Sequence, residues 1–180
     1  GLGDVYKRQA LQRIGASDIS ECSKSIDFCD GDREWENYFN DLLEKNDIES
    51  VNAISSAINR LSSHSDAISE NLYKLSSVME FAGVTFDDTV KVIRLARCLE
   101  EFCYYREMKD DEMLGRTLKE QEYCDIPDSM DKYMDYERYA RDFLEEKGGA
   151  YTKNGDVVYL REDQSLSEIL GENDIKMGGI

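Results

Sequence analysis

The chain has 180 residues, and its 39 aspartates and glutamates exceed its 22 lysines and arginines, which gives a formal net charge of -17. This acidity argues against direct binding to nucleic-acid phosphates or to anionic membranes, because both depend on Lys and Arg. A hydrophobic content of 41% can nevertheless fill a core. No apolar run approaches the roughly 20 residues that span a bilayer. We therefore expect a soluble and folded protein.

Residues 1–9 read Gly-Leu-Gly-Asp-Val-Tyr-Lys-Arg-Gln and resemble translated sequencing-adapter read-through. We interpret them as an artefact at the end of a fragment whose first domain is incomplete, and an ordinary flexible N-terminus is the alternative. Asp4 is outweighed there by Lys7 and Arg8, so removing the stretch changes the net charge from -17 to -18. The acidity therefore belongs to the rest of the chain.

Helices are predicted after this stretch. Residues 27–47 contain a Gly-marked turn followed by aromatic residues and leucines among acids, which predicts a loop and then a short helix. In residues 48–61 apolar side chains recur at helical spacing, which predicts an amphipathic helix. Either Asn46 or Asp47 suits its N-cap.

Two further helices are expected next. Residues 65–82 carry apolar side chains on one helical face, and Gly83 is a natural stop after them. A third helix follows, running to about Ala96. Its N-cap is predicted at Asp87 or Thr85.

The following segment mixes strand and helix patterns. Residues 98–105 have the aromatic content of a strand, and residues 110–118 predict a polar helix. Pro127 lies just before Asp128, a suitable start for a helix that includes the series of aromatic residues in 133–143.

A β-hairpin is predicted near the C-terminal end. Residues 150–153 and 156–160 flank Asn154-Gly155, which is a strong signal for a tight hairpin turn. A short helix around 167–170 and a glycine-containing tail complete the chain. The single proline disfavours a loop-rich sandwich, so we expect a helix-rich α+β fold with an acidic surface.

The charge is distributed unevenly. Acids outnumber bases by 9 to 3 in residues 21–47, by 6 to 5 in residues 48–98 and by 16 to 8 in residues 99–147. Acid is thus concentrated on both sides of a nearly neutral middle. A general bias toward solubility would not require this pattern.

Residues for nucleophilic catalysis and metal binding are few. His64 is the single histidine, and its polar surroundings predict a surface loop. Asp30 and Asp32 flank Gly31 without the remaining ligands of a calcium loop. The five cysteines, at positions 22, 29, 98, 103 and 124, form no C-x-x-C pair, so we expect neither disulfides nor zinc. The sequence predicts a cytoplasmic protein with no metal site and no cofactor.

One enzyme-like pattern remains as an alternative. Pro127-Asp128 followed by Glu145 and Lys147 formally matches the acid-acid-lysine arrangement of metal-dependent nucleases. In those nucleases the Glu-x-Lys segment resembles an apolar strand, whereas here it ends a predicted helix. A nuclease would also need a basic groove, and the sequence has no basic cluster. We therefore expect no enzymatic activity.

A distinctive segment runs from Asp125 to Leu144 and is followed by Gly148 and the hairpin. It resembles the C-terminal signature of the ArdA antirestriction protein family. That pattern is a proline-led helix, then Tyr-x-Asp-Tyr, then a small residue with Arg-Asp, then a glycine and a terminal hairpin. The matching residues are Pro127, Tyr133, Asp135, Tyr136, Tyr139, Ala140, Arg141 and Asp142. Phe143 replaces the leucine that is usual in the family.

The resemblance extends from about Leu11 to Leu160 and implies an elongated homodimer of small α/β domains whose carboxylates imitate DNA phosphates. Such a protein would inhibit type I restriction–modification enzymes by occupying their DNA-binding groove. It would act in the bacterial cytoplasm and be encoded on a phage, plasmid or conjugative transposon. The resemblance divides the chain into a first-domain remnant, a helical middle domain, a C-terminal α/β domain and a tail. Their ranges are 10–46, 47–98, 99–162 and 163–180.

The candidate site is the set of acids in the two acidic regions. It comprises Glu100, Glu101, Glu107, Asp110, Asp111, Glu112, Glu120, Glu122, Asp125, Asp128, Asp131, Asp135, Glu137, Asp142, Glu145 and Glu146, together with Asp30, Asp32, Glu34, Glu36, Asp41 and Glu44. Acids three or four apart on a helix lie roughly 5 to 6 Å from each other, which suits a row of phosphate substitutes.

Several alternatives stay open. The acids can be a solvated surface without a partner, and Arg141 and Asp142 can be a structural ion pair. Tyr133, Tyr136 and Tyr139 are expected to be core or dimer contacts. The mimicry can also be directed at another DNA-binding protein, such as a CRISPR effector or a nucleoid protein.

Overall fold

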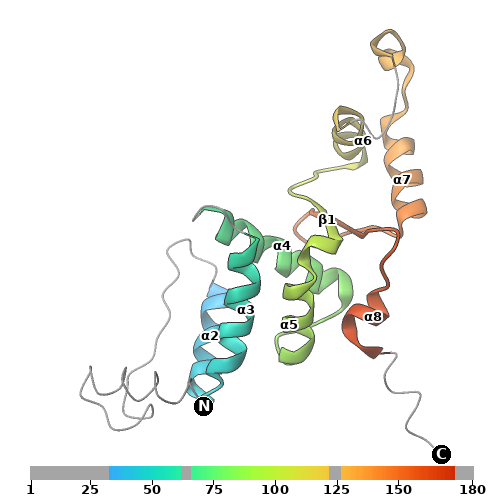
Figure 1. Ribbon diagram of the computed structural model, residues 1–180. Helices are drawn as coiled ribbons and strands as arrows, with labels where there is room; N and C mark the ends of the chain where they lie inside the picture. The colour runs from blue at the N-terminus through green and yellow to red at the C-terminus, as the bar shows by residue number, and fades with distance from the viewer. Residues whose placement is uncertain (1–32, 62–65, 122–126, 173–180) are drawn as a thin grey trace, which may run out of the picture. The chain divides into compact units, whose positions relative to one another are not determined.

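The computed structural model describes residues 33–61, 66–121 and 127–172, which are coloured in Figure 1. The chain divides into two compact units, Gly1–Ala53 and Ile54–Ile180. The described residues form a helix-rich α+β fold with a three-stranded antiparallel sheet, and the predicted fold class is confirmed. No helix among them is long and apolar enough to cross a membrane.

In the first unit, helix α2 spans Arg33–Glu44. Its apolar residues Trp35, Tyr38, Phe39 and Leu42 recur at helical spacing and are all buried. The helix expected within 27–47 is therefore confirmed for the part that the structure describes, whereas the preceding turn lies outside it.

Helix α3 spans Ile48–Arg60 and continues into the second unit. Of the two residues predicted as its N-cap, Asp47 fills the role, because its Oδ1 accepts a hydrogen bond from the Ser50 N–H at 3.1 Å. Helix α4 spans Asp66–Ala82 and stops before Gly83, as predicted.

Helix α5 spans Thr89–Arg97, but the prediction of its N-cap was wrong. The cap is Asp88, whose Oδ1 accepts from the Lys91 N–H at 3.1 Å. Thr85 belongs to the preceding turn, where its carbonyl accepts from the Asp88 N–H. An N-cap must stand directly before the first helical residue so that its side chain reaches the N–H three positions on.

The segment expected as one strand divides into two elements. Leu99–Glu101 forms the 3₁₀ turn η2, and Phe102–Tyr105 forms strand β1. The predicted hairpin is confirmed as β2 (Ala150–Tyr151) and β3 (Val157–Leu160). Its connection is longer than the predicted tight turn at Asn154-Gly155, because Tyr151 pairs with Val157 and the Thr152 N–H donates to the Asp156 carbonyl. The sheet order is β1-β3-β2, and β1 pairs with β3 so that Tyr105 lies opposite Val157.

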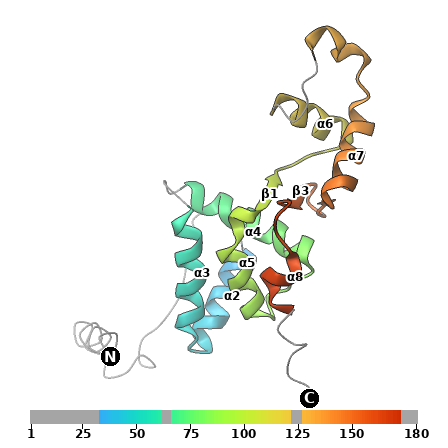
Figure 2. The ribbon, with the colours of Figure 1, turned by 45° about the vertical axis from the view of Figure 1, so that its right-hand side comes forward.

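Helices cover both faces of this sheet, as Figure 2 shows for α4 and α7. On one face, Tyr105, Val157 and Tyr159 share a core cluster with residues of α6 (Asp111–Glu120) and α7 (Tyr136–Lys147). On the other face, Phe102 makes an edge-to-face contact with Phe81 of α4 at 6.4 Å between ring centroids. Alternate strand residues therefore belong to two different cores.

The helix predicted to start at Asp128 begins later than expected. Asp128–Tyr133 is the 3₁₀ helix η3, Met134 is extended, and α7 starts only at Tyr136. The aromatic series was interpreted as one helical face, but Tyr133 belongs to η3 and is 71% exposed. The expected short C-terminal helix is confirmed as α8, Leu166–Leu170.

Candidate functional site

Helix α6 separates an apolar face from a charged one. Its N-cap is Asp110, whose Oδ1 accepts from the Met113 N–H at 2.8 Å, and Asp111 and Glu112 follow in the first turn. Acids at this end of a helix are favoured by the helix dipole. Leu114, Gly115 and Leu118 are buried, whereas Glu112 and Glu120 are exposed. Because the apolar side of the helix packs in the core, its acids face solvent.

Helix α7 has the same organisation. Asp135 caps it by accepting from the Arg138 N–H at 3.0 Å, and its buried residues are Tyr136, Ala140 and Phe143. Four acids lie on the exposed remainder of the helix: Glu137, Asp142, Glu145 and Glu146. Their positions follow from the spacing of the buried face, because residues between apolar positions of a helix point outward.

The two helices approach closely at Gly115. A Cβ atom added there would lie 2.2 Å from the backbone oxygen of Tyr136, which leaves no space for a larger residue. Glycine is unfavourable inside a helix, so close packing against α7 explains its presence. This contact sets the spacing of the two acidic helices.

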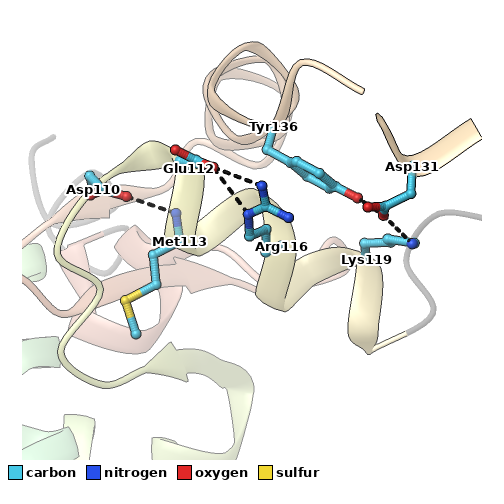
Figure 3. A network of polar contacts seen from close by, with 7 residues as sticks. All are labelled: Asp110, Glu112, Met113, Arg116, Lys119, Asp131 and Tyr136. Carbon is cyan, nitrogen blue, oxygen red and sulfur yellow. Dashed lines mark hydrogen bonds and ion pairs between the residues drawn. The ribbon is translucent and has the colours of Figure 1, made fainter. Parts of the chain in front are cut away.

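A polar network then joins α6, η3 and α7 (Figure 3). The Asp131 carboxylate accepts hydrogen bonds from the Lys119 ammonium group and from the Tyr136 hydroxyl. The Arg116 guanidinium lies 4.5 Å from the centroid of the Tyr136 ring and donates to Glu112 Oε1 at 2.8 and 3.1 Å. Two of the predicted surface acids, Glu112 and Asp131, are thus engaged within the protein.

Protonation in the network follows from these contacts. The hydrogen bond from Lys119, followed by that from Tyr136, lowers the pKa of Asp131 below its ordinary value. The hydrogen bond to Asp131 in turn raises the pKa of Tyr136. Asp131 is therefore ionised and Tyr136 is a hydrogen-bond donor at neutral pH.

Other candidate acids form exposed ion pairs. Arg138 Nε lies 3.6 Å from Asp142, and Arg141 lies 3.8 Å from Asp111 and 3.9 Å from Glu137. The proposed structural pair of Arg141 with Asp142 was therefore wrong, because each residue pairs with a neighbour one helical turn away or on α6. Further pairs of this kind are Glu107 with Arg106, Glu146 with Lys147 and Asp41 with Lys45.

A third group of acids forms no ion pair with a cation in the described part of the chain. Among the described residues, no ion pair within 4.0 Å involves Glu36, Glu44, Glu100, Glu101, Glu120, Asp135 or Glu145. Glu34 lies in the first turn of α2 and is exposed. Asp30, Asp32, Glu122 and Asp125 lie outside the described residues, as does the side chain of Asp128.

Comparison with known proteins identifies the family of the chain that carries this acidic surface. The family model for the antirestriction protein ArdA matches residues 8–158. The chain belongs to the ArdA antirestriction protein family. The resemblance seen in the sequence is thereby confirmed, and membership implies restriction–modification enzymes as targets. The comparisons with curated proteins and with solved structures gave no match.

The ArdA signature residues have different positions in the structure. Tyr136 and Ala140 are buried, Tyr139 is half-buried against the core cluster, and Tyr133 is exposed. Pro127 directly precedes η3. The signature thus contains residues that shape the junction of η3 with α7 as well as exposed charges.

The residues of the nuclease alternative lie in the same region. Glu145 and Lys147 lie at the end of α7, and Lys147 forms ion pairs with Glu146 and Glu162. In the part of the chain that is described, no group of three or more His, Cys, Asp or Glu residues could hold a metal ion. Cys98 and Cys103 are free thiols, whereas His64 and the other cysteines lie outside the described residues.

One acid that was not predicted as a site residue is buried. Asp156 follows the hairpin turn and is only 6% exposed. Asn154-Gly155 predicted a turn there, but no pattern in the sequence indicated that this carboxylate would be buried. Its contacts come from residues up to 79 positions away, which no local pattern shows.

Proposed function

We propose that this protein inhibits type I restriction–modification enzymes by presenting surface carboxylates in place of the phosphates of a DNA duplex. The observation that carries the proposal is the outward acidic face of α6, α7 and their N-caps. Residues 99–147 contain 16 acids and 8 bases, and the packing faces of both helices direct most of the described acids to solvent.

Spacing supports this role. Acids three or four residues apart on a helix lie roughly 5 to 6 Å from each other. Duplex DNA carries one charge per about 1.7 Å of its axis when both strands are counted. Two adjacent acidic helices therefore offer a density of charge that Lys and Arg of a DNA-binding groove can recognise.

The arginines of α7 do not cancel this charge. Ion pairs between exposed side chains contribute about 0 to 1 kcal/mol, so a cation of the target can replace Arg138 beside Asp142 or Arg141 beside Glu137. The charge of the target's groove then provides attraction over a longer range. We further propose that the protein acts as a homodimer, without catalysis, in the cytoplasm of a bacterial host.

The test is inhibition of a purified type I enzyme. DNA methylation and cleavage should both decrease as the protein is added, and the inhibition should weaken as the salt concentration rises. Additional duplex DNA should relieve it, because a phosphate mimic and DNA occupy the same groove. Unchanged activity of several type I enzymes at excess protein would contradict the proposal, and inhibition that DNA cannot relieve would contradict mimicry.

A further inference from the structure

The buried Asp156 carboxylate connects three separate elements. It accepts hydrogen bonds from Ser77 Oγ of α4 at 2.6 Å, from the Tyr104 hydroxyl of β1 at 3.2 Å and from the Glu107 backbone N–H at 2.8 Å. Burial, followed by the charge of Asp156, raises the pKa of Tyr104. The tyrosine therefore stays protonated and donates its hydrogen.

Asp156 is itself fixed by the hairpin. Its backbone N–H donates to Thr152 Oγ1 at 3.1 Å, and its carbonyl accepts from the Thr152 N–H at 2.8 Å. Thr152 is also buried. A carboxylate held at both backbone groups is a rigid acceptor, and charge-assisted hydrogen bonds to it are stronger than neutral ones.

The most informative of its donors is Glu107. This residue has a φ of 56°, a left-handed conformation that non-glycine residues seldom adopt. Its N–H points to Asp156, whereas its side chain is 74% exposed and belongs to the candidate acidic surface. Three residues later Asp110 caps α6. The unusual backbone at Glu107 thus sets the direction in which the chain reaches the acidic helix.

We propose that Asp156 is a positioning residue of the inhibitor, holding Glu107 in its left-handed conformation and thereby fixing Glu107 and the N-terminal acids of α6 in one arrangement. The inference rests on the proposed function. Asp156 adds nothing to the exposed charge. Its contribution is preorganisation, because surface groups that are already ordered lose less conformational freedom when a partner binds.

The first experiment compares Asp156→Asn with Asp163→Asn, which removes the same charge from an exposed position outside the network. Loss of the charge-assisted hydrogen bonds should weaken inhibition about tenfold in Asp156→Asn, and the salt dependence should stay that of the wild type. Hydrogen exchange at the Glu107 amide should become faster. Asp163→Asn should change none of these. A reduced salt dependence in Asp156→Asn would overturn the proposal, because it would identify Asp156 as a surface contact.

The second experiment is a rescue by glycine at position 107. Glycine adopts a positive φ without support from Asp156. Glu107→Gly alone should weaken inhibition through its lost charge, and adding Asp156→Asn to it should cause little further loss. Fully additive losses would contradict the positioning role, because they would show that Asp156 acts independently of the backbone at Glu107.

Two milder variants cover the case in which Asp156→Asn does not fold. Ser77→Ala and Tyr104→Phe each remove one donor and should raise exchange at the Glu107 amide to a smaller extent. Unchanged exchange in both would overturn the proposal. Failure of the proposed function can be distinguished from failure of this inference. In that case the wild-type protein would inhibit no type I enzyme, whereas hydrogen exchange would still report on the role of Asp156.

Discussion

The middle of the chain and its C-terminal region use charge differently. Residues 48–98 contain 6 acids and 5 bases, whereas residues 99–147 contain 16 acids and 8 bases. Basic residues of this middle region have specific contacts: Lys91 pairs with Glu172 at 3.0 Å, and the Arg60 guanidinium donates to the backbone carbonyl of Arg97 at 3.0 Å. In α6 and α7 the acids exceed what the internal contacts use.

This difference shows where packing determines the sequence and where it does not. Three positions of α6 and three of α7 are buried, and Tyr139 and Leu144 of α7 are half-buried against the same core. The exposed positions of these helices can accept any polar residue. Acids occupy many of them. An excess at positions that the core leaves open is what a binding surface would produce.

The largest expected effect concerns the buried face of α7. Phe143 packs edge-on against Tyr159 at 5.3 Å between ring centroids, and Phe143→Ala should lower the free energy of unfolding by about 3–5 kcal/mol. Val90 on α5 is 61% exposed, so Val90→Ala should change it by no more than about 0.5 kcal/mol. Chemical denaturation measures both. Similar losses of stability in the two variants would contradict the assignment of Phe143 to a buried helix face and of Val90 to an exposed one.

A smaller loss is expected at the contact between α6 and α7. Alanine usually stabilises a helix relative to glycine, by about 1 kcal/mol. At Gly115 the clash with the Tyr136 oxygen should reverse this sign and destabilise the protein by about 1–3 kcal/mol. Ser56→Ala on the exposed side of α3 is the control and should be neutral or slightly stabilising. A Gly115→Ala variant with a raised melting temperature would contradict the close approach.

A pH-dependent effect is expected at Asp131. Its pKa lies below the ordinary value of 3.8 because Lys119 and Tyr136 donate to it. Its contribution to stability is therefore present above that ordinary value and is lost as the pH falls through the lowered pKa. The difference in stability between wild type and Asp131→Asn should be constant near neutral pH and shrink in acid. A difference independent of pH down to about 2 would contradict the network.

The smallest effect on stability is expected at Asp142. Its pair with Arg138 is exposed, so Asp142→Asn should change the free energy of unfolding by less than about 0.5 kcal/mol. Inhibition of the type I enzyme should nevertheless weaken, because the residue belongs to the proposed binding face. Thermal denaturation and the inhibition assay together test this separation. A large loss of stability would show instead that the acid is structural.

Local patterns in the sequence were sufficient to predict most elements. Apolar residues at helical spacing predicted α3 and α4, and Asn154-Gly155 predicted the hairpin. The aromatic series around Tyr133 and Tyr136 was wrongly interpreted as one helix. Its residues have helical spacing but belong to two elements, η3 and α7, which are separated by the extended Met134. The N-cap at Asp88 was missed because Asp87 beside it is chemically equivalent.

The candidate site was less predictable than the fold. Charge counts identified the acidic region, and helical spacing indicated that many of its acids would be exposed. Neither could show that Asp131 is engaged by Lys119 and Tyr136 or that Asp156 is buried. Those contacts depend on tertiary packing, which brings together residues from different elements.

The most direct test of the central claim compares two variants of equal charge in the inhibition assay. One carries Glu137→Gln, Glu145→Gln and Glu146→Gln on α7, and the other carries Glu49→Gln, Glu70→Gln and Asp87→Asn at exposed positions of the nearly neutral middle. We predict that the α7 variant inhibits the type I enzyme more weakly. The slope of the logarithm of its apparent affinity against the logarithm of the salt concentration should fall in magnitude by about one for each lost contact. The control should inhibit like the wild type. Equal inhibition by the two variants would contradict the account.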